Sequence, residues 1–241
     1  MLHNTRGIVF HQVKYSETSI IVKIYTELFG LQSYLIRGVR SKKSKIKPAL
    51  LQHLTLVDLI VYHKQKKDIQ TIKEVKIAYP YKTIPYDIIK SSVAVFLNEV
   101  LYKVIREEEP NPGLFAFLFN SLQILDIREK NIADFYLIFL IRLTKYLGFF
   151  PKNNFSVQNC NFHLEEGLFT LNTHPEELIV KKPFSEYLSD LTETSYENST
   201  KLKILPQHRS KLLEDILNYY QLHIPAVINI KSHHVLQTVL N

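Results

Sequence analysis

The spacing of hydrophobic residues changes once along this chain, near residue 80, and the change divides the chain into two parts. Up to residue 77, segments rich in Ile, Val, Tyr and Thr partly alternate hydrophobic with polar residues, which is typical of β-strands. These segments are residues 5–10, 19–25, 31–37, 54–63 and 69–77. After "YPYKTIPYD" the hydrophobic residues recur every three to four positions, which indicates helices. We therefore expect an α+β protein with a β domain at 1–80 and a helical domain at 81–241.

Five short strands, with one longer link between the third and the fourth, fit a small closed barrel of the oligonucleotide-binding (OB) type. A plain antiparallel sandwich fits the same segments almost as well. Helical spacing favours an all-α bundle after the barrel, built from helices within residues 87–109, 113–127, 132–148 and 206–224. Residues 151–206 are less regular. We expect a small β-hairpin insertion there, within "NFHLEEGLFTLNT", followed by a polar loop with at most one helical turn.

Several classes of protein are excluded by missing motifs. The chain has six glycines, and none lies in a dinucleotide-binding or P-loop pattern, so ATP hydrolysis is not expected. Neither a G-x-S-x-G elbow nor an H-E-x-x-H helix is present, and Cys160 has no charged neighbour within four positions. Cys160 and His163 have the spacing of metal ligands and His174 follows, but a fourth ligand is missing nearby. We expect neither an enzyme nor a metal site.

Missing sequence features also suggest the cellular compartment. One cysteine cannot form an intramolecular disulfide, and the start "MLHNTRGIVF" lacks the features of a signal peptide. The most apolar run, "FYLIFLI" at 135–141, is far shorter than the roughly 20 residues that cross a bilayer. We therefore expect a cytoplasmic protein without a membrane span.

Positive charge is concentrated in the β domain. Residues 1–80 contain fourteen Lys and Arg against five Asp and Glu, whereas the remainder contains sixteen against eighteen. Six of the cations lie at the end of the third strand and in the link to the fourth, with no acidic residue among them: Arg37, Arg40, Lys42, Lys43, Lys45 and Lys47. Such a run is either a solvated loop or a site for a polyanion.

The second interpretation is favoured by the surroundings of this run. It connects two strands of a possible barrel, the rings of Tyr34 and His53 flank it, and Lys23 and further lysines belong to the same domain. OB barrels bind single strands with a cationic groove and aromatic platforms. We expect Arg37, Arg40, Lys42, Lys43, Lys45 and Lys47 to contact phosphates, together with Lys23 and Tyr34. Six phosphate contacts would give single-strand binding a log-log salt slope of about −4.

Several short motifs form a recognisable combination. The N-terminal ones are Gly7 to Phe10, Glu17 with Thr18, Thr26 to Gly30, and the basic loop from Gly38 to Ser44. They are followed by the helical segments "EEEPNPGLFAFLFNSLQIL" and "FLIRLTKYLGFFP". Together these motifs resemble the RecO family of recombination mediators. About 150 residues carry the resemblance, and the C-terminal third matches only loosely.

The resemblance implies a function. RecO-like proteins consist of an OB barrel and a helical domain, bind single- and double-stranded DNA, and anneal strands coated by the single-stranded-DNA-binding protein. With RecR they load RecA, without hydrolysing ATP. A nucleoid-associated protein is therefore expected. The acidic, phenylalanine-ended tail of the single-stranded-DNA-binding protein would need an apolar pocket rimmed by cations, for which Arg142 and Lys145 are candidates. A salt-bridge role at the rim of the core fits these two residues equally well.

One departure from the family concerns zinc. Many members carry a four-cysteine zinc site after the G-x-x-P segment, whereas this chain has only Cys160 there. We expect the metal to be absent and the hairpin to be held by packing of Phe155, Phe162, Leu168 and Phe169. Two other functions remain open: an RNA-binding OB module on a helical scaffold, and a protein-binding adaptor whose charged loop is idle.

Overall fold

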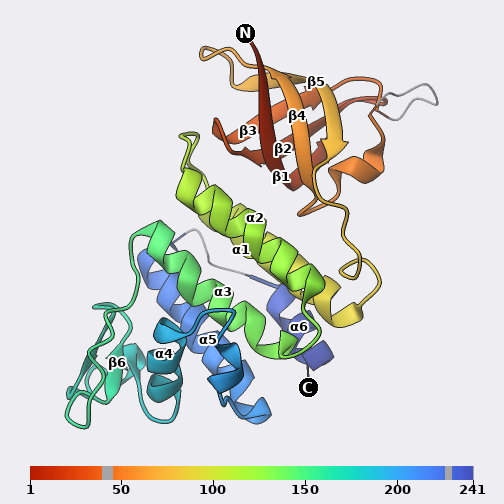
Figure 1. The fold of residues 1–241 in the computed structure, drawn as a ribbon. Helices are drawn as coiled ribbons and strands as arrows, with labels where there is room; N and C mark the ends of the chain where they lie inside the picture. Colours follow the sequence, from red (N-terminus) through yellow and green to blue (C-terminus); the bar gives the residue numbers. More distant parts are fainter. Residues whose placement is uncertain (40–45, 226–229, 241) are drawn as a thin grey trace. The chain divides into compact units, whose positions relative to one another are not determined.

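The computed structural model describes residues 1–39, 46–225 and 230–240 (Figure 1). The chain forms two compact units, Met1–Ile127 and Arg128–Asn241. The strands of the first part end at Ile77, close to the expected boundary, but the first unit continues through two helices to Ile127. The helices are thus divided between the units.

The first unit begins with a five-stranded closed barrel in the order β1-β2-β3-β5-β4. Its strands are β1 Leu2–Lys14, β2 Ile20–Thr26, β3 Gly30–Ile36, β4 Leu56–Tyr62 and β5 Ile69–Ile77, with the 3-10 helix η1 Pro48–Leu51 between β3 and β4. All neighbouring strands pair antiparallel except β3 and β5, which pair in parallel and close the barrel. The predicted OB-type barrel is confirmed, and the sandwich is excluded.

The barrel closes because each strand turns one set of hydrophobic side chains inward. In β2, Ile20, Val22 and Ile24 are buried, while Ile21 and Lys23 between them are only half-buried. The inner side chains of all five strands form one hydrophobic core, to which Leu51 of η1 also contributes. At about 25 cal/mol per Å² of buried apolar surface, this shared core is the main source of the barrel's stability.

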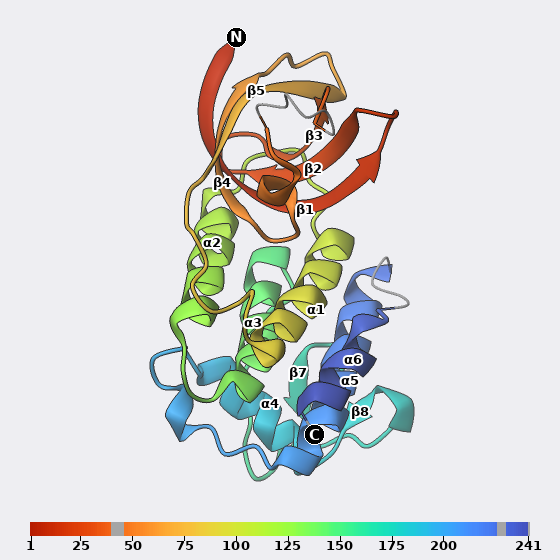
Figure 2. The same ribbon diagram turned by 90° about the vertical axis from the view of Figure 1, so that its right-hand side faces the viewer.

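Two helices of the same unit, α1 Ile88–Val104 and α2 Pro112–Ile127, lie on one side of the barrel (Figures 1 and 2). The segment between them contacts the turn before β3, because the Leu31 amide donates to the Glu107 carbonyl at 3.0 Å. The close contact between these two backbone segments requires glycine at position 30, where φ is +61° and a Cβ would lie 2.9 Å from the Glu107 carbonyl oxygen.

The linker between the barrel and α1 is anchored to the end of α2 by one carboxylate. Asp126 is fully buried and accepts hydrogen bonds from the backbone amides of Lys82, Thr83 and Ile84 at 2.8–3.1 Å. The Lys90 ammonium, also buried, donates to the Asp126 carbonyl at 2.7 Å. Burial alone would raise the pKa of Asp126, but these amide donors outweigh it and lower the pKa. The carboxylate therefore stays charged and fixes the linker.

The second unit consists of helices and one small sheet. Its helices are α3 Ile132–Leu147, α4 Phe184–Glu193, α5 Pro206–His223 and α6 Ser232–Leu240, with 3-10 turns η2 Glu176–Leu178 and η3 Ser199–Lys201. The sheet has the order β7-β6-β8, with β6 Asn161–His163, β7 Leu168–Thr170 and β8 Ile179–Val180. The predicted hairpin is β6 and β7. The third strand was not predicted, and α4 replaces the expected polar loop.

No helix in the described part of the chain is both long and apolar enough to cross a membrane.

Candidate nucleic-acid interface

Three exposed cations from separate parts of the chain gather at one end of the barrel, which we call the basic end: Lys14, Arg37 and Lys47. Strand register brings the first two together, since Lys14 pairs with Ile20 and Ile20 pairs with Ile36, the residue before Arg37. Lys47 precedes Pro48, which lines a surface cavity of about 310 Å³ together with Lys14. One acidic residue, Glu17, is exposed in the nearby β1–β2 turn.

The chain from Arg37 to Lys47, which we call the basic segment, is attached to the barrel near both of its ends. Val39 is buried in the barrel core, and Ile46 packs against the same core. The other predicted phosphate contacts, Arg40, Lys42, Lys43 and Lys45, lie outside the described residues. The structure therefore places the two flanking cations of the segment, Arg37 and Lys47, in solvent at the basic end.

Tyr34 cannot serve as a base platform in this structure. Its side chain is fully buried in the barrel core with Ile36. Burial also raises the pKa of its hydroxyl, so the ring is neutral. The expectation that Tyr34 stacks on a base is wrong, because β3 turns this residue to the inside of the barrel.

The Lys23 side chain reaches toward Tyr102 of α1. Its ammonium lies 5.6 Å from the centre of the Tyr102 ring, over which it can form a cation–π contact. His11 contacts the same ring, with centroids 4.7 Å apart, and stacks near His53 at 6.0 Å. Lys23 is half-buried in this cluster, so a role at a nucleic-acid surface stays a prediction.

Two histidines of the barrel have pKa values below the ordinary value. Burial lowers the pKa of His11, and the nearby His53 and Lys23 lower it further. Burial likewise lowers the pKa of His63, assisted by His3 and the N-terminal ammonium. In both cases the fold favours the neutral ring.

We therefore expect stability to fall as the pH falls. The unfolded chain takes up protons on these rings below about pH 6.5, where the folded chain resists protonation, so the free energy of unfolding decreases from about pH 7 toward 5. Thermal melts at pH 7.5 and 5.5 measure the effect, and a His11→Gln/His63→Gln double variant should show a smaller difference. An unchanged difference in the variant would contradict this assignment.

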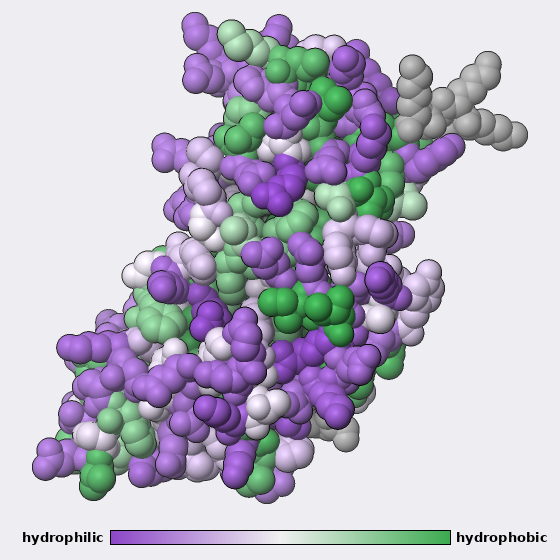
Figure 3. Space-filling model, in the orientation of Figure 1, coloured by the Kyte–Doolittle hydropathy of each residue, from purple (hydrophilic) through white to green (hydrophobic). Residues whose placement is uncertain are grey.

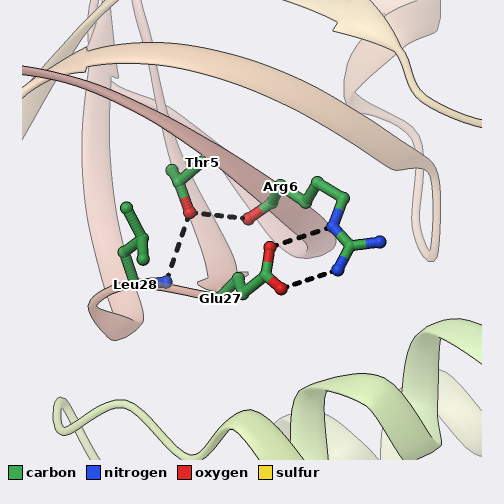
Figure 4. Close-up of polar contacts among 4 residues, drawn as sticks. All are labelled: Thr5, Arg6, Glu27 and Leu28. Atoms are coloured by element: carbon green, nitrogen blue, oxygen red, sulfur yellow. Dashed lines mark hydrogen bonds and ion pairs between the residues drawn. The ribbon is translucent and has the colours of Figure 1, made fainter.

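A second part of the barrel surface is unsuited to a polyanion. A cavity of about 460 Å³ there is lined by Glu27, Asp58 and Glu74 as well as by cations. Arg6 is engaged with Glu27 through two hydrogen bonds, from Nε at 2.9 Å and from Nη2 at 2.6 Å (Figure 4). These bonds raise the pKa of Arg6 and lower that of Glu27. Arg6 therefore adds nothing to the free positive charge.

Exposed tyrosines are an element of the surface that the sequence did not identify. Tyr15 is 62% exposed next to Lys14, and Tyr62 is 45% exposed at the end of β4. The visible face of the barrel in Figure 3 is mainly hydrophilic, with small hydrophobic areas between. In the sequence, the exposure of Tyr62 is indicated only by its place among the outward-facing residues of an alternating strand.

The predicted partner residues Arg142 and Lys145 lie on α3 in the second unit. The Arg142 side chain is half-buried, and its Nε donates to the Thr194 carbonyl at 3.0 Å, which fixes the chain after α4. Lys145 is exposed in the last helical turn. Arg142 therefore has a structural role, and binding of a partner by either residue stays a prediction.

The hairpin of the second unit is held by aromatic packing, as predicted. Phe169 contacts Phe155 and Phe162 with ring centroids 5.3 and 5.1 Å apart, and Phe162 contacts Tyr219 of α5 at 5.4 Å. Within residues 1–39, 46–225 and 230–240, no three His, Cys, Asp or Glu side chains could together hold a metal ion. The side chains near Cys160 thus do not fit the four-cysteine zinc site found in many members of the family that the sequence resembles.

Comparison with known proteins decides the family. The model for the N-terminal part of recombination protein O matches residues 1–81, and the model for its C-terminal part matches residues 85–232. The chain belongs to the RecO family. Relatives named DNA repair protein RecO include those of Azobacteroides pseudotrichonymphae and Phocaeicola vulgatus, 33% and 34% identical over 100% of both chains. That of Flavobacterium psychrophilum is 38% identical over 98% of both chains.

Membership in the RecO family places the chain in DNA repair and recombination. The two RecO models meet at residues 81–85, within the linker that Asp126 anchors. The barrel is thus the N-terminal RecO domain, and the C-terminal RecO model begins just before α1.

Proposed function

We propose that this RecO-family chain is a recombination mediator that binds single- and double-stranded DNA through the basic end of its barrel. The observation that carries the proposal is the convergence of Lys14, Arg37 and Lys47 at one end of a closed barrel. The remaining cations of the basic segment belong to the chain between Val39 and Ile46, which both contact the barrel core.

Annealing follows from the charge of this surface. Two DNA strands repel each other through their phosphates, and a cationic surface that holds one strand lowers the barrier to pairing with the other. Release of condensed counterions drives the binding and makes it dependent on salt. Phosphate contacts carry no sequence information, so the chain would anneal strands of any sequence.

The mediator role also involves other proteins. We propose that the chain acts on strands coated by the single-stranded-DNA-binding protein, whose acidic tail it would bind near Lys145, and that it works with RecR to load RecA at the nucleoid. The chain would do so without nucleotide hydrolysis and without zinc in its hairpin, since the described donors do not form such a site.

An annealing assay with the full chain tests this function. We expect the chain to accelerate pairing of complementary DNA strands coated by the single-stranded-DNA-binding protein, and to bind a DNA oligomer at least as tightly as the RNA oligomer of the same sequence. Preference for RNA together with no annealing would favour an RNA-binding module instead.

A further inference from the structure

The loop between β4 and β5 is held in one conformation by a buried glutamine. Gln70 is 2% exposed, and its side chain accepts a hydrogen bond from the Lys64 amide at 2.9 Å. The same side chain donates to the carbonyls of Lys64 and Lys67 at 2.9 and 2.6 Å. On the other side, His63 stacks on Phe29 with ring centroids 4.0 Å apart. The lysines are therefore presented from a preorganised backbone, which reduces the entropy lost on binding.

A small cavity beside this loop combines an aromatic ring with positive charge. The cavity, of about 240 Å³, is lined by Tyr62, Ile69, Lys64 and Lys67 with Gln70 and Thr71, and no carboxylate is part of its lining. Tyr62 and Ile69 are 45% and 42% exposed. Exposed aromatic and aliphatic side chains flanked by ammonium groups offer a stacking surface for a base and contacts for its phosphates.

Between this cavity and the basic end, the outward residues of the paired stretch of β3 and β5 are uncharged. The outward residues of the β3–β5 pair are Ser33, Leu35, Ile69 and Thr71. Because Ser33 pairs with Ile69, Arg37 lies four residues further along, on the order of 13 Å at the rise of a β-strand. OB barrels bind along the face of strands 2 and 3 between the loops that flank it, with sites of about 4–16 nucleotides.

We propose that the β4–β5 loop is a subsite for an unpaired base of single-stranded DNA, in which Tyr62 stacks on the base and Lys64 and Lys67 contact the neighbouring phosphates. This inference rests on the proposed function, since the same strand would continue over β3 to the basic end. Only a single strand fits, because a base inside a duplex has no free face for the ring. The loop thereby selects unpaired DNA, which the phosphate contacts of the basic end alone do not.

Binding of a fluorescent oligothymidylate, followed by anisotropy, tests the subsite. Loss of base stacking of about 1–3 kcal/mol corresponds to about 5- to 150-fold weaker binding for Tyr62→Leu. Tyr62→Phe keeps the ring and should bind like the unchanged chain. Tyr86→Leu is the matched control, because Tyr86 is 87% exposed in the same unit but lies outside the cavity. Circular dichroism confirms that each variant is folded.

A second probe separates stacking from charge. On an oligomer whose bases are replaced by abasic sites, Tyr62→Leu should bind like the unchanged chain, whereas a Lys64→Gln/Lys67→Gln variant should lose affinity on both oligomers. The same double variant should reduce the log-log salt slope by about 1.4. Lys76→Gln, which removes an ammonium paired with Glu74, should leave the slope unchanged.

The outcomes distinguish this inference from the proposed function. If Tyr62→Leu binds as tightly as Tyr62→Phe while Arg37→Glu/Lys47→Glu weakens binding, the subsite is wrong and the basic end stands. Equal loss on normal and abasic oligomers would also overturn base stacking. If the unchanged chain binds neither DNA oligomer at low salt, both proposals fail.

Discussion

Replacing Arg40, Lys42 and Lys43 together by glutamate should abolish retention of single-stranded DNA at physiological salt while the barrel remains folded. Three of six phosphate contacts are lost, so the log-log salt slope of binding should fall from about −4 to about −2. Three new negative charges also repel the phosphates of the strand. We expect affinity to drop by at least about 100-fold and annealing to drop with it. A salt series of binding and annealing rates measures both.

The matched control changes net charge by the same amount at another place. Lys130, Lys152 and Lys203 are exposed in the second unit, and their joint replacement by glutamate should leave the slope near its original value. If both triple variants bind equally, the effect is one of overall charge and not of this segment. If the first variant still retains and anneals DNA, the charged loop is idle, as in an adaptor.

The largest effect on stability is expected for Asp126→Ala. The change removes the acceptor for the backbone amides of Lys82, Thr83 and Ile84 and leaves these donors unpaired inside the unit. Lys90 keeps its hydrogen bond, because that bond is to the backbone carbonyl of residue 126. Leaving amide donors unsatisfied inside a protein costs about 1–3 kcal/mol each, so we expect a loss of about 3–5 kcal/mol, a large share of a typical free energy of unfolding of about 5–15 kcal/mol.

Urea unfolding followed by circular dichroism measures this loss. Asp126→Asn keeps one acceptor oxygen and should lose less than the alanine variant. Asp68→Ala is the control, since Asp68 is exposed in the β4–β5 loop and should change stability by no more than about 0.5 kcal/mol. An alanine variant at 126 as stable as the one at 68 would show that the linker is held by other contacts.

Most elements of the fold could be predicted because their hydrophobic pattern repeats over several turns or residues. The five strands and the helices α1, α2, α3 and α5 all have such patterns and were found close to their predicted positions. Helix α4 was missed because its buried positions, Leu188 and Leu191, are surrounded by serine, threonine and acidic residues. Strand β8 has two residues and depends on pairing with β6, which no local pattern encodes.

The site was less predictable for two physical reasons. In β3 both faces carry hydrophobic residues, Leu31 and Leu35 on one and Tyr34 and Ile36 on the other, so alternation could not show which face is inside. The larger side chains fill the barrel, and Tyr34 is therefore lost as a base platform. The conformation of the β4–β5 loop depends on the Gln70 side chain turning inward to bond the backbone of Lys64 and Lys67, and the sequence does not reveal that orientation.

The closure of the barrel restricts how partner proteins can attach. Since every described strand of the barrel has two hydrogen-bonded neighbours, none of these strands has a whole edge free for a peptide to add as a further strand. A protein tail that binds there must rely on side-chain contacts. The small sheet of the second unit is open, but the edge of its outer strand β7 is also covered, because Leu168 bridges to Lys152 and the Phe169 backbone exchanges hydrogen bonds with the Asn154 side chain.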